Sequence, residues 1–261
     1  MPVETHVDRA RTRAEAEREA IEAKAEAFEA FCDRVSAVRA VSAPAATGAT
    51  ATAGTQLRTD SAGEDRCRAV RTAFAETVRP HSVADVDEAE PLLETVREEL
   101  TDAVAVALAP TTGARFTAEL KRMVLAETRA RRAETAALRE AIDRERTHLR
   151  EATETVDEVT AWLAEADETP LSDLGFDALE ARHDRLAGHR TRCERLARDR
   201  QGFLRETTTE AGDAGIRHRD LVPYLYRDFP VDHPVLATAA RLDDVCSDCQ
   251  QAVRDHLVRR A

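Results

Sequence analysis

The feature that most constrains the fold is a stretch from Phe116 to Glu168 that contains neither proline nor glycine. Both residues disfavour helix interiors, so their absence permits one helix of about 50 residues, roughly 75 Å long at 1.5 Å per residue. In its later part, residues spaced alternately three and four apart form a seam, a line of core-facing positions on one side of a helix. The seam consists of Leu138, Ile142, Glu145, Leu149, Ala152, Val156, Val159 and Leu163.

A second arm of the same kind follows residues 168–176, where proline and glycine end the first helix. It is predicted to run from Asp177 to about Thr207, with a seam of Leu179, Arg182, Leu186, His189, Cys193, Leu196, Arg200 and Phe203. Residues 151–168 contain seven acids and no base, whereas residues 182–205 contain eight arginines and three acids. Exposed ion pairs each contribute little, but together they favour one register. The sequence therefore predicts an antiparallel coiled-coil hairpin.

Residues 1–41 are predicted to form a further heptad helix. Thr5 and Asp8 form a weak capping-box pattern at its start. Its seam is Val7, Ala10, Ala14, Glu17, Ile21, Lys24, Phe28, Phe31, Val35 and Val38. Residues 42–63 are almost entirely Ala, Thr, Ser, Gly and Pro, a composition typical of a flexible linker. The heptad helix is expected to pack on the hairpin as a third strand or to pair with another copy.

The remaining segments are predicted to be shorter helices. Residues 64–110 form a short helical pair, with helices at 65–78 and 91–108 that prolines delimit. The hairpin occupies residues 111–210, and residues 211–261 form a small C-terminal helical cap. The predicted fold class is therefore all-α, with a long antiparallel coiled-coil hairpin, an N-terminal heptad helix and a small C-terminal helical cap.

Composition supports thin helical packing. Aromatic residues make up 4% of the chain and much of the apolar fraction is alanine, which buries little area and does not favour a thick layered core. The net charge is −12, and all but two of the 38 basic residues are arginine. This bias resembles proteins of salt-loving archaea, in which an acidic surface maintains solubility and says little about partners.

The sequence also indicates where the protein resides. The longest notable apolar stretch, residues 103–109, is far shorter than the about 20 residues that a membrane span needs. The N-terminal residues lack the apolar core of a signal peptide. Five cysteines are few and odd in number for a secreted disulfide scaffold. We therefore expect a reduced, cytoplasmic protein that does not associate with membranes.

The strongest candidate for chemistry is the pair Cys246 and Cys249, whose spacing places both sulfurs on one face of a helix. A redox role is disfavoured because the pair lies inside a predicted helix with no strand before it. His189 and Cys193, four residues apart on the second arm, would complete a Cys₃His zinc site if that arm packs on the last helix. The favoured alternative is that these cysteines are small buried seam residues, because nothing in the sequence forces the two helices together.

Other functional motifs are absent from the sequence. There is no glycine-rich phosphate loop, GxSxG, HExxH or dinucleotide fingerprint, so we expect no catalytic residues and, apart from the zinc hypothesis, no cofactor. Nucleic-acid binding is disfavoured because the acidic arm of the hairpin neutralises the arginines of residues 182–205. Residues 215–261 contain seven arginines and seven aspartates and so offer no basic surface.

Four stretches carry a family resemblance: ETHVDRARTRAEAEREA, RCRAVRTAFAETVRPHSVADVDEAEP, WLAEADETPLSDLGFDALEARHDRL and YLYRDFPVDHPVLATAARL. Together they touch nearly the whole chain, which resembles a family of uncharacterised haloarchaeal helical proteins. The resemblance supports a salt-adapted archaeal protein and implies no activity or site residue. The expected function is a non-enzymatic scaffold or protein-interaction module that binds a protein partner or another copy through its seams. The alternative is a zinc- or thiol-dependent helical regulator, associated with DNA, that uses Cys246 and Cys249.

Overall fold

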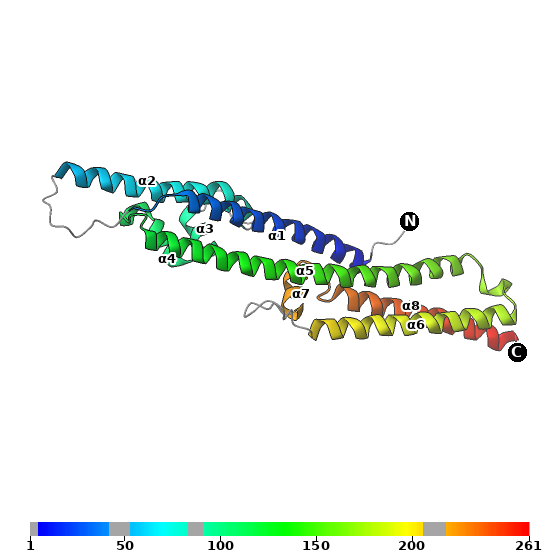
Figure 1. Cartoon of the computed structure of the whole chain (residues 1–261). Helices are drawn as coiled ribbons and strands as arrows, with labels where there is room; N and C mark the ends of the chain where they lie inside the picture. The colour runs from blue at the N-terminus through cyan, green and yellow to red at the C-terminus, as the bar shows by residue number, and fades with distance from the viewer. Residues whose placement is uncertain (1–4, 42–52, 83–90, 206–217, 261) are drawn as a thin grey trace. The chain divides into compact units, whose positions relative to one another are not determined.

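The structure, a computed structural model, describes residues 5–41, 53–82, 91–205 and 218–260. Within these ranges the chain is almost entirely α-helical and has no β-strand, which confirms the all-α fold class (Figure 1). The helices are α1 (His6–Ala37), α2 (Ala53–Thr77), α3 (Leu92–Glu99), α4 (Asp102–Leu108), α5 (Ala118–Asp167), α6 (Phe176–Arg205), α7 (His218–Tyr226) and α8 (Pro234–Arg260). No helix of the described ranges is long and apolar enough to cross a membrane.

Helix α1 begins with the predicted capping box. The backbone N–H of Thr5 donates to Asp8 Oδ2 at 2.9 Å, and the N–H of Asp8 donates to Thr5 Oγ1 at 3.3 Å. Every residue of its predicted seam is buried or half-buried. The helix ends at Ala37, and Val41 then donates its backbone N–H to the carbonyl of Phe116 at 2.8 Å. The heptad pattern therefore identified the correct face of α1.

The predicted linker is wrong in its second part. Residues 53–63 belong to α2, which begins at Ala53, whereas residues 42–52 lie outside the described residues. The two glycines of α2 each cost about 1 kcal/mol relative to alanine, which explains why the composition indicated coil. Helical stability in proteins comes mostly from packing of a buried face, and α2 presents one at Val70 and Phe74, both fully buried.

The helix predicted over residues 91–108 is in fact two helices, α3 and α4. Leu100 has φ −119° and ψ −94°, outside the helical range, and Thr101 is extended. The Thr101 hydroxyl accepts a hydrogen bond from the N–H of Val104 at 3.4 Å and so caps α4. The sequence carries a local signal for this break, because Thr followed by Asp is typical of a helix start, but the apolar spacing continues across it.

The two predicted arms are α5 and α6, which agree with the predicted ranges to within two residues at each described end. They run antiparallel, because Glu158 pairs with Arg192 at 3.2 Å, whereas Glu145, which comes earlier in α5, pairs with Arg200, which comes later in α6. The turn between them contains the 3₁₀-helix η3, Leu171–Asp173. All predicted seam residues of both arms are buried or half-buried. Coiled-coil geometry of this pair remains a prediction.

The C-terminal segment differs from the predicted small cap. Helix α8 packs along α6 in antiparallel orientation, because Asp243 pairs with Arg190 at 3.0 Å and Gln250 donates to the carbonyl of His183 at 3.3 Å. Its buried side chains extend from Val235 to Val253. The apolar spacing therefore continues along most of α8, so α6 packs against two long helices instead of one.

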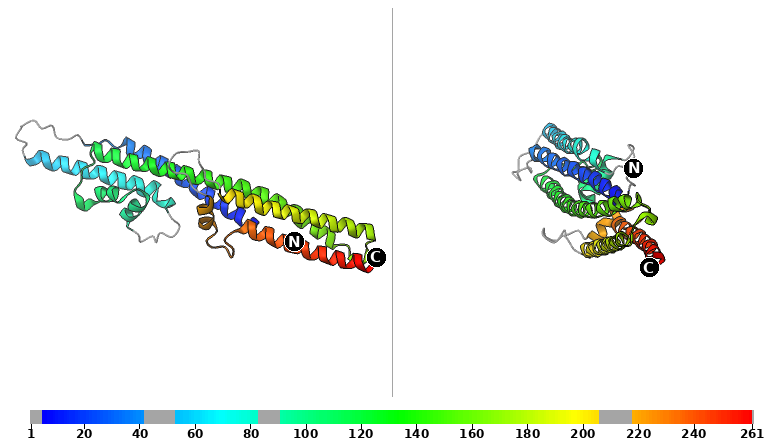
Figure 2. Two further views of the ribbon diagram at one scale, coloured as in Figure 1. Left: turned by 90° about the horizontal axis from the view of Figure 1, so that it is seen from below. Right: turned by 90° about the vertical axis from the view of Figure 1, so that its right-hand side faces the viewer.

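The chain forms two compact units. Unit 1 consists of Met1–Arg18 and Glu140–Ala261, and unit 2 of Glu19–Arg139. In unit 1, α6 and α8 lie alongside the last part of α5 in both views of Figure 2. The units differ from the predicted domain ranges because the long helices α1 and α5 each contribute to both.

Unit 2 has an aromatic core that the low aromatic content did not predict. The Phe31 and Phe74 rings meet edge to face with centroids 5.4 Å apart. Phe28 and Phe116 belong to the same cluster, and all four side chains are fully buried. Four of the ten aromatic residues therefore form one cluster where α1, α2 and the segment before α5 meet.

Candidate functional site

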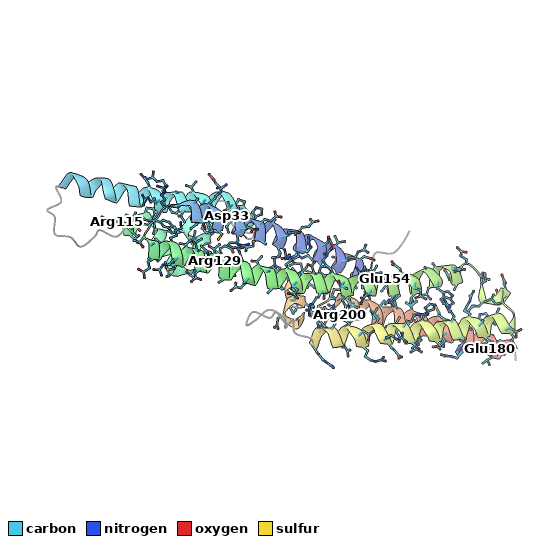
Figure 3. All side chains as sticks on the ribbon, in the orientation of Figure 1. Asp33, Arg115, Arg129, Glu154, Glu180 and Arg200 are labelled. Atoms are coloured by element: carbon cyan, nitrogen blue, oxygen red, sulfur yellow. The ribbon has the colours of Figure 1, made fainter. Side chains whose placement is uncertain are left out.

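The most unusual chemical feature of unit 1 is a pair of charged residues at seam positions. Glu145 interrupts the seam of α5 and Arg200 that of α6, and neither side chain has any exposed surface. A buried charge costs several kcal/mol unless it is paired and hydrogen-bonded. Because α5 and α6 run antiparallel, the two interruptions lie opposite each other and pair. Figure 3 labels Arg200 on α6.

The two charges form a bidentate ion pair to which a tyrosine adds a third hydrogen bond. Arg200 Nη1 and Nη2 donate to Glu145 Oε2 and Oε1, each at 2.8 Å. The hydroxyl of Tyr226, the last residue of α7, donates to Glu145 Oε1 at 2.6 Å. We call Glu145, Arg200 and Tyr226 the Glu145 cluster. It links three helices, α5, α6 and α7, through one carboxylate.

Aromatic rings surround the cluster. The Arg200 guanidinium carbon lies 5.3 Å from the centroid of the Phe203 ring, close enough for a cation–π interaction. Phe203 also stacks against His148 with centroids 4.5 Å apart, and Tyr226 meets Phe229 edge to face at 5.2 Å. These rings exclude water and so strengthen the attraction between the two charges.

The ionisation of the cluster suits a structural role. Burial is the largest influence on the pKa of Glu145 and raises it, but the charge and hydrogen bonds of Arg200, together with the Tyr226 hydrogen bond, outweigh burial and lower that pKa overall. Burial, followed by the Glu145 charge, raises the pKa of Tyr226. At neutral pH the carboxylate is therefore ionised and the phenol protonated. Neither group is tuned to exchange a proton near pH 7.

Helix α7 makes a second polar contact, with α1. The hydroxyl of Tyr224 donates to Glu17 Oε1 at 2.5 Å, and Arg13 pairs with Glu17 at 3.0 Å. Burial and the hydrogen bond to Glu17 raise the pKa of Tyr224 to about 12. Glu17 is one of the two polar residues in the predicted seam of α1, and here it binds α7 of the same chain. The first part of α1 thus packs within unit 1.

A corresponding polar group lies in unit 2. The other polar residue of the α1 seam, Lys24, pairs with Glu99 at 2.6 Å, and Arg131 approaches Glu99 at 3.4 Å. Glu99 is buried, with 3% of its surface exposed. Glu17 and Lys24 of α1, Glu145 of α5 and Arg200 of α6 are therefore polar seam residues with specific partners, a device that fixes the register of packed helices.

The structure brings together only part of the proposed zinc site. His189 and Cys193 lie buried on α6, and Cys246 lies buried on the adjacent α8, while Cys249 is half-buried. The His189 ring stacks on Trp162 of α5 at 4.8 Å, and neither of its nitrogens has a hydrogen-bond partner. Among the described residues, no group of three or more His, Cys, Asp or Glu side chains is placed to hold a metal ion. These four residues therefore do not fit a zinc site as they are arranged here.

The thiols are also poorly suited to chemistry. Burial raises the pKa of Cys193 to about 11 and that of Cys246 to about 12, and it raises the pKa of Cys249 as well. The thiolate is the form that attacks disulfides, so a raised pKa disfavours thiol–disulfide exchange. Buried cysteines with a raised pKa agree with the alternative interpretation, in which these cysteines are small seam residues.

The buried histidines predict how stability depends on pH. Burial, aided by nearby arginines, lowers the pKa of His189 and of His148. In the unfolded chain both titrate near pH 6.5, so below that pH the unfolded state binds more protons than the folded state. The free energy of unfolding is therefore expected to fall as the pH is lowered from about 7.5 to 5.5.

Urea denaturation at these two pH values measures the effect. The difference in the free energy of unfolding between about pH 7.5 and pH 5.5 is expected to be smaller in His189→Phe than in the unmodified protein. Replacement of the exposed His233 by glutamine serves as the control and should leave the difference unchanged. An equal pH dependence in all three proteins would contradict the assignment to His189.

Sequence reasoning missed the cluster, although a signal for part of it was present. Glu145 and Arg200 were each placed in a seam as an interruption, and the antiparallel register that places 151–168 beside 182–205 also places these two residues opposite each other. Opposite charges at facing seam positions indicate a buried ion pair. Tyr226 had no such signal, because its role depends on how α7 packs.

Comparison with known proteins gives a family but no activity. The family model described as "Domain of unknown function (DUF7260)" matches residues 5–250. The chain belongs to this family. The DUF7260 match begins before α1 and ends within α8, so it includes all of unit 2, most of unit 1 and every member of the Glu145 cluster. No curated protein and no solved structure matches the chain.

Proposed function

We propose that this DUF7260 protein is a non-enzymatic, cytoplasmic scaffold that works by binding another protein. The observation that carries the proposal is that the buried groups able to do chemistry are engaged in packing. Glu145 holds Arg200 and Tyr226 by charge and hydrogen bonds. His189 packs on Trp162, and the thiol of Cys193 is buried and protonated. Such groups stabilise helices against one another and leave the exposed helix faces for recognition.

The charge pattern of α6 supports a protein partner over nucleic acid. Arg190, Arg192 and Arg200, three of the eight arginines of α6, each pair with a carboxylate of the same chain, which reduces the basic surface that α6 can offer. A nucleic-acid site needs arginines available to neutralise phosphates. The raised thiol pKa values likewise give no support to a thiol-dependent regulator, and the described residues form no group of metal ligands that would support a zinc-dependent one.

Site-specific photo-crosslinking in the native organism tests the proposal. A photoreactive amino acid is placed singly at Asp33, Arg129, Glu154 and Glu180, four exposed positions on three helices, α1, α5 and α6 (Figure 3). Substitutions at such positions leave the core intact, so each variant should fold. We expect at least one position to give a discrete adduct with one protein species, and excess unlabelled protein to abolish it. The proposal would be overturned if the cross-linked species were simply the most abundant cellular proteins. It would also be overturned if no position gave an adduct.

A further inference from the structure

We infer that the end of unit 1 formed by the α5–α6 turn and the last turns of α8 is a docking surface for a protein segment with apolar anchors flanked by lysine or arginine. This inference rests on the proposed function and assigns its binding site and the chemistry of its partner. We call the surface the apolar tip. Its apolar side chains are Leu171, Leu174, Phe176, Leu257 and Val258.

The antiparallel packing of α6 and α8 brings these residues to one place. Residues nearer the start of α6 contact residues nearer the end of α8: Arg190 contacts Asp243, and the earlier His183 contacts the later Gln250. The same register places Phe176 level with Leu257. The 3₁₀-helix η3 also contacts α8. Figures 1 and 2 show the end of α8 beside the α5–α6 turn.

The apolar tip is exposed to an unusual degree. Phe176 is 50% exposed and Val258 77% exposed, and these are two of the four large hydrophobic side chains classed as exposed in the described ranges. Leu171, Leu174 and Leu257 are half-buried and adjoin them. Exposed apolar side chains that gather at one place, rather than singly, mark interaction surfaces.

Unpaired carboxylates lie at the end of α5, in the α5–α6 turn and at the start of α6, on both sides of Leu171, Leu174 and Phe176 in the sequence. They are Glu165, Asp167, Glu168, Asp173, Asp177 and Glu180, all exposed. Along the described chain none of them forms an ion pair, whereas Arg190, Arg192 and Arg200 of α6 have carboxylate partners. The nearest arginine of α6, Arg182, donates to the carbonyl of Thr169 at 3.2 Å instead. The last turns of α8 add three arginines, Arg254, Arg259 and Arg260, and one aspartate, Asp255, so the tip remains acidic overall.

The acidic charge of the apolar tip indicates which kind of partner can bind there. Phosphates of nucleic acids and of anionic membranes would be repelled by an acidic rim. Two copies meeting tip to tip would oppose like charges, which costs affinity. A protein segment with basic residues around apolar anchors satisfies both features, because the anchors cover Phe176 and Val258 while the basic residues meet the carboxylates.

The test places p-benzoylphenylalanine at Phe176 and, in a second variant, at Val258. Val106 of α4, 49% exposed, is the matched control for Phe176, which is 50% exposed. Mass spectrometry of the adduct identifies the cross-linked peptide. We expect adducts from both tip positions, absent from Val106, and a cross-linked peptide that contains apolar residues and carries net positive charge.

Charge reversal supplies the second measurement. Asp173→Lys, Asp177→Lys and Glu180→Lys together, in the Phe176 photo-crosslinking chain, are expected to lower the adduct yield about tenfold or more. The matched control reverses three exposed carboxylates of α5, Glu151, Glu154 and Asp157, and should leave the yield unchanged. Circular dichroism verifies that both triple variants remain folded.

The outcomes separate the two proposals. An adduct that is a lipid, an acidic peptide or a second copy of this chain, or a yield that charge reversal does not change, would overturn the docking surface. If other exposed positions give specific adducts and the tip gives none, the docking surface fails and the scaffold function stands. If no position on the chain gives a specific adduct, the scaffold function itself fails.

Discussion

Replacing Arg200 with methionine is expected to lower the free energy of unfolding by about 3–5 kcal/mol, because it leaves the buried carboxylate of Glu145 without its counter-charge. Tyr226 still donates one hydrogen bond to that carboxylate, but a neutral hydroxyl cannot replace a bidentate guanidinium. Trp162, the only tryptophan of the chain, lies on α5 in unit 1 and reports unfolding by its fluorescence during urea titration.

Two further variants distinguish the stability effect of the buried Glu145–Arg200 pair from that of an exposed ion pair. Arg192→Met breaks an exposed pair with Glu158 and should cost less than about 1 kcal/mol. A triple variant with methionine at Glu145 and Arg200 and phenylalanine at Tyr226 removes the whole polar cluster and should recover much of the lost stability. If Arg200→Met proves no worse than Arg192→Met, the Glu145 cluster does not stabilise unit 1 as described.

Replacing Phe31 with alanine is expected to destabilise unit 2 by about 3–5 kcal/mol, the usual cost of removing a fully buried phenylalanine. The substitution leaves a cavity and also removes the edge-to-face contact with Phe74, at a centroid distance of 5.4 Å. Since unit 2 contains no tryptophan, amide hydrogen exchange is the suitable measurement. Protection should fall in α1 after Glu19 and in α2.

The control for this prediction is Phe176→Ala, which removes a half-exposed ring and should change stability by about 0.5 kcal/mol or less. In a double-mutant cycle, Phe31→Ala and Phe74→Ala should together cost less than the sum of the single variants, because the first substitution already removes their contact. Strict additivity would mean that the two rings do not interact.

The long helices could be predicted because their signals are local and repeated. Seam residues of α1, α5 and α6 recur along many turns, so one atypical residue does not obscure the pattern. The start of α2 and the break at Thr101 could not be predicted in the same way. At both places helical and non-helical signals are mixed within a few residues, and tertiary packing decides between them.

The candidate site was predictable only in part. The sequence placed Glu145, Arg200, His189 and Cys193 on core faces, where the structure has them. Which partner each would meet depends on the register between helices. Tyr226 joins Glu145 across 81 residues of chain, and no periodic pattern carries that information. The sequence also gave no measure of how far burial raises the pKa of the cysteines.

Unit 1 is discontinuous in the chain, since Met1–Arg18 packs with Glu140–Ala261 whereas unit 2 is continuous. During synthesis the face formed by Val7, Ala10 and Ala14, all fully buried in the finished protein, emerges long before the helices that cover it. Unit 2 has all its residues by Arg139 and is able to fold first. Closure of unit 1 then requires contacts between residues far apart in sequence, which slows folding. A nascent chain therefore exposes the apolar face of its N-terminal helix for most of its synthesis. Chaperone binding at this face would protect the chain from aggregation.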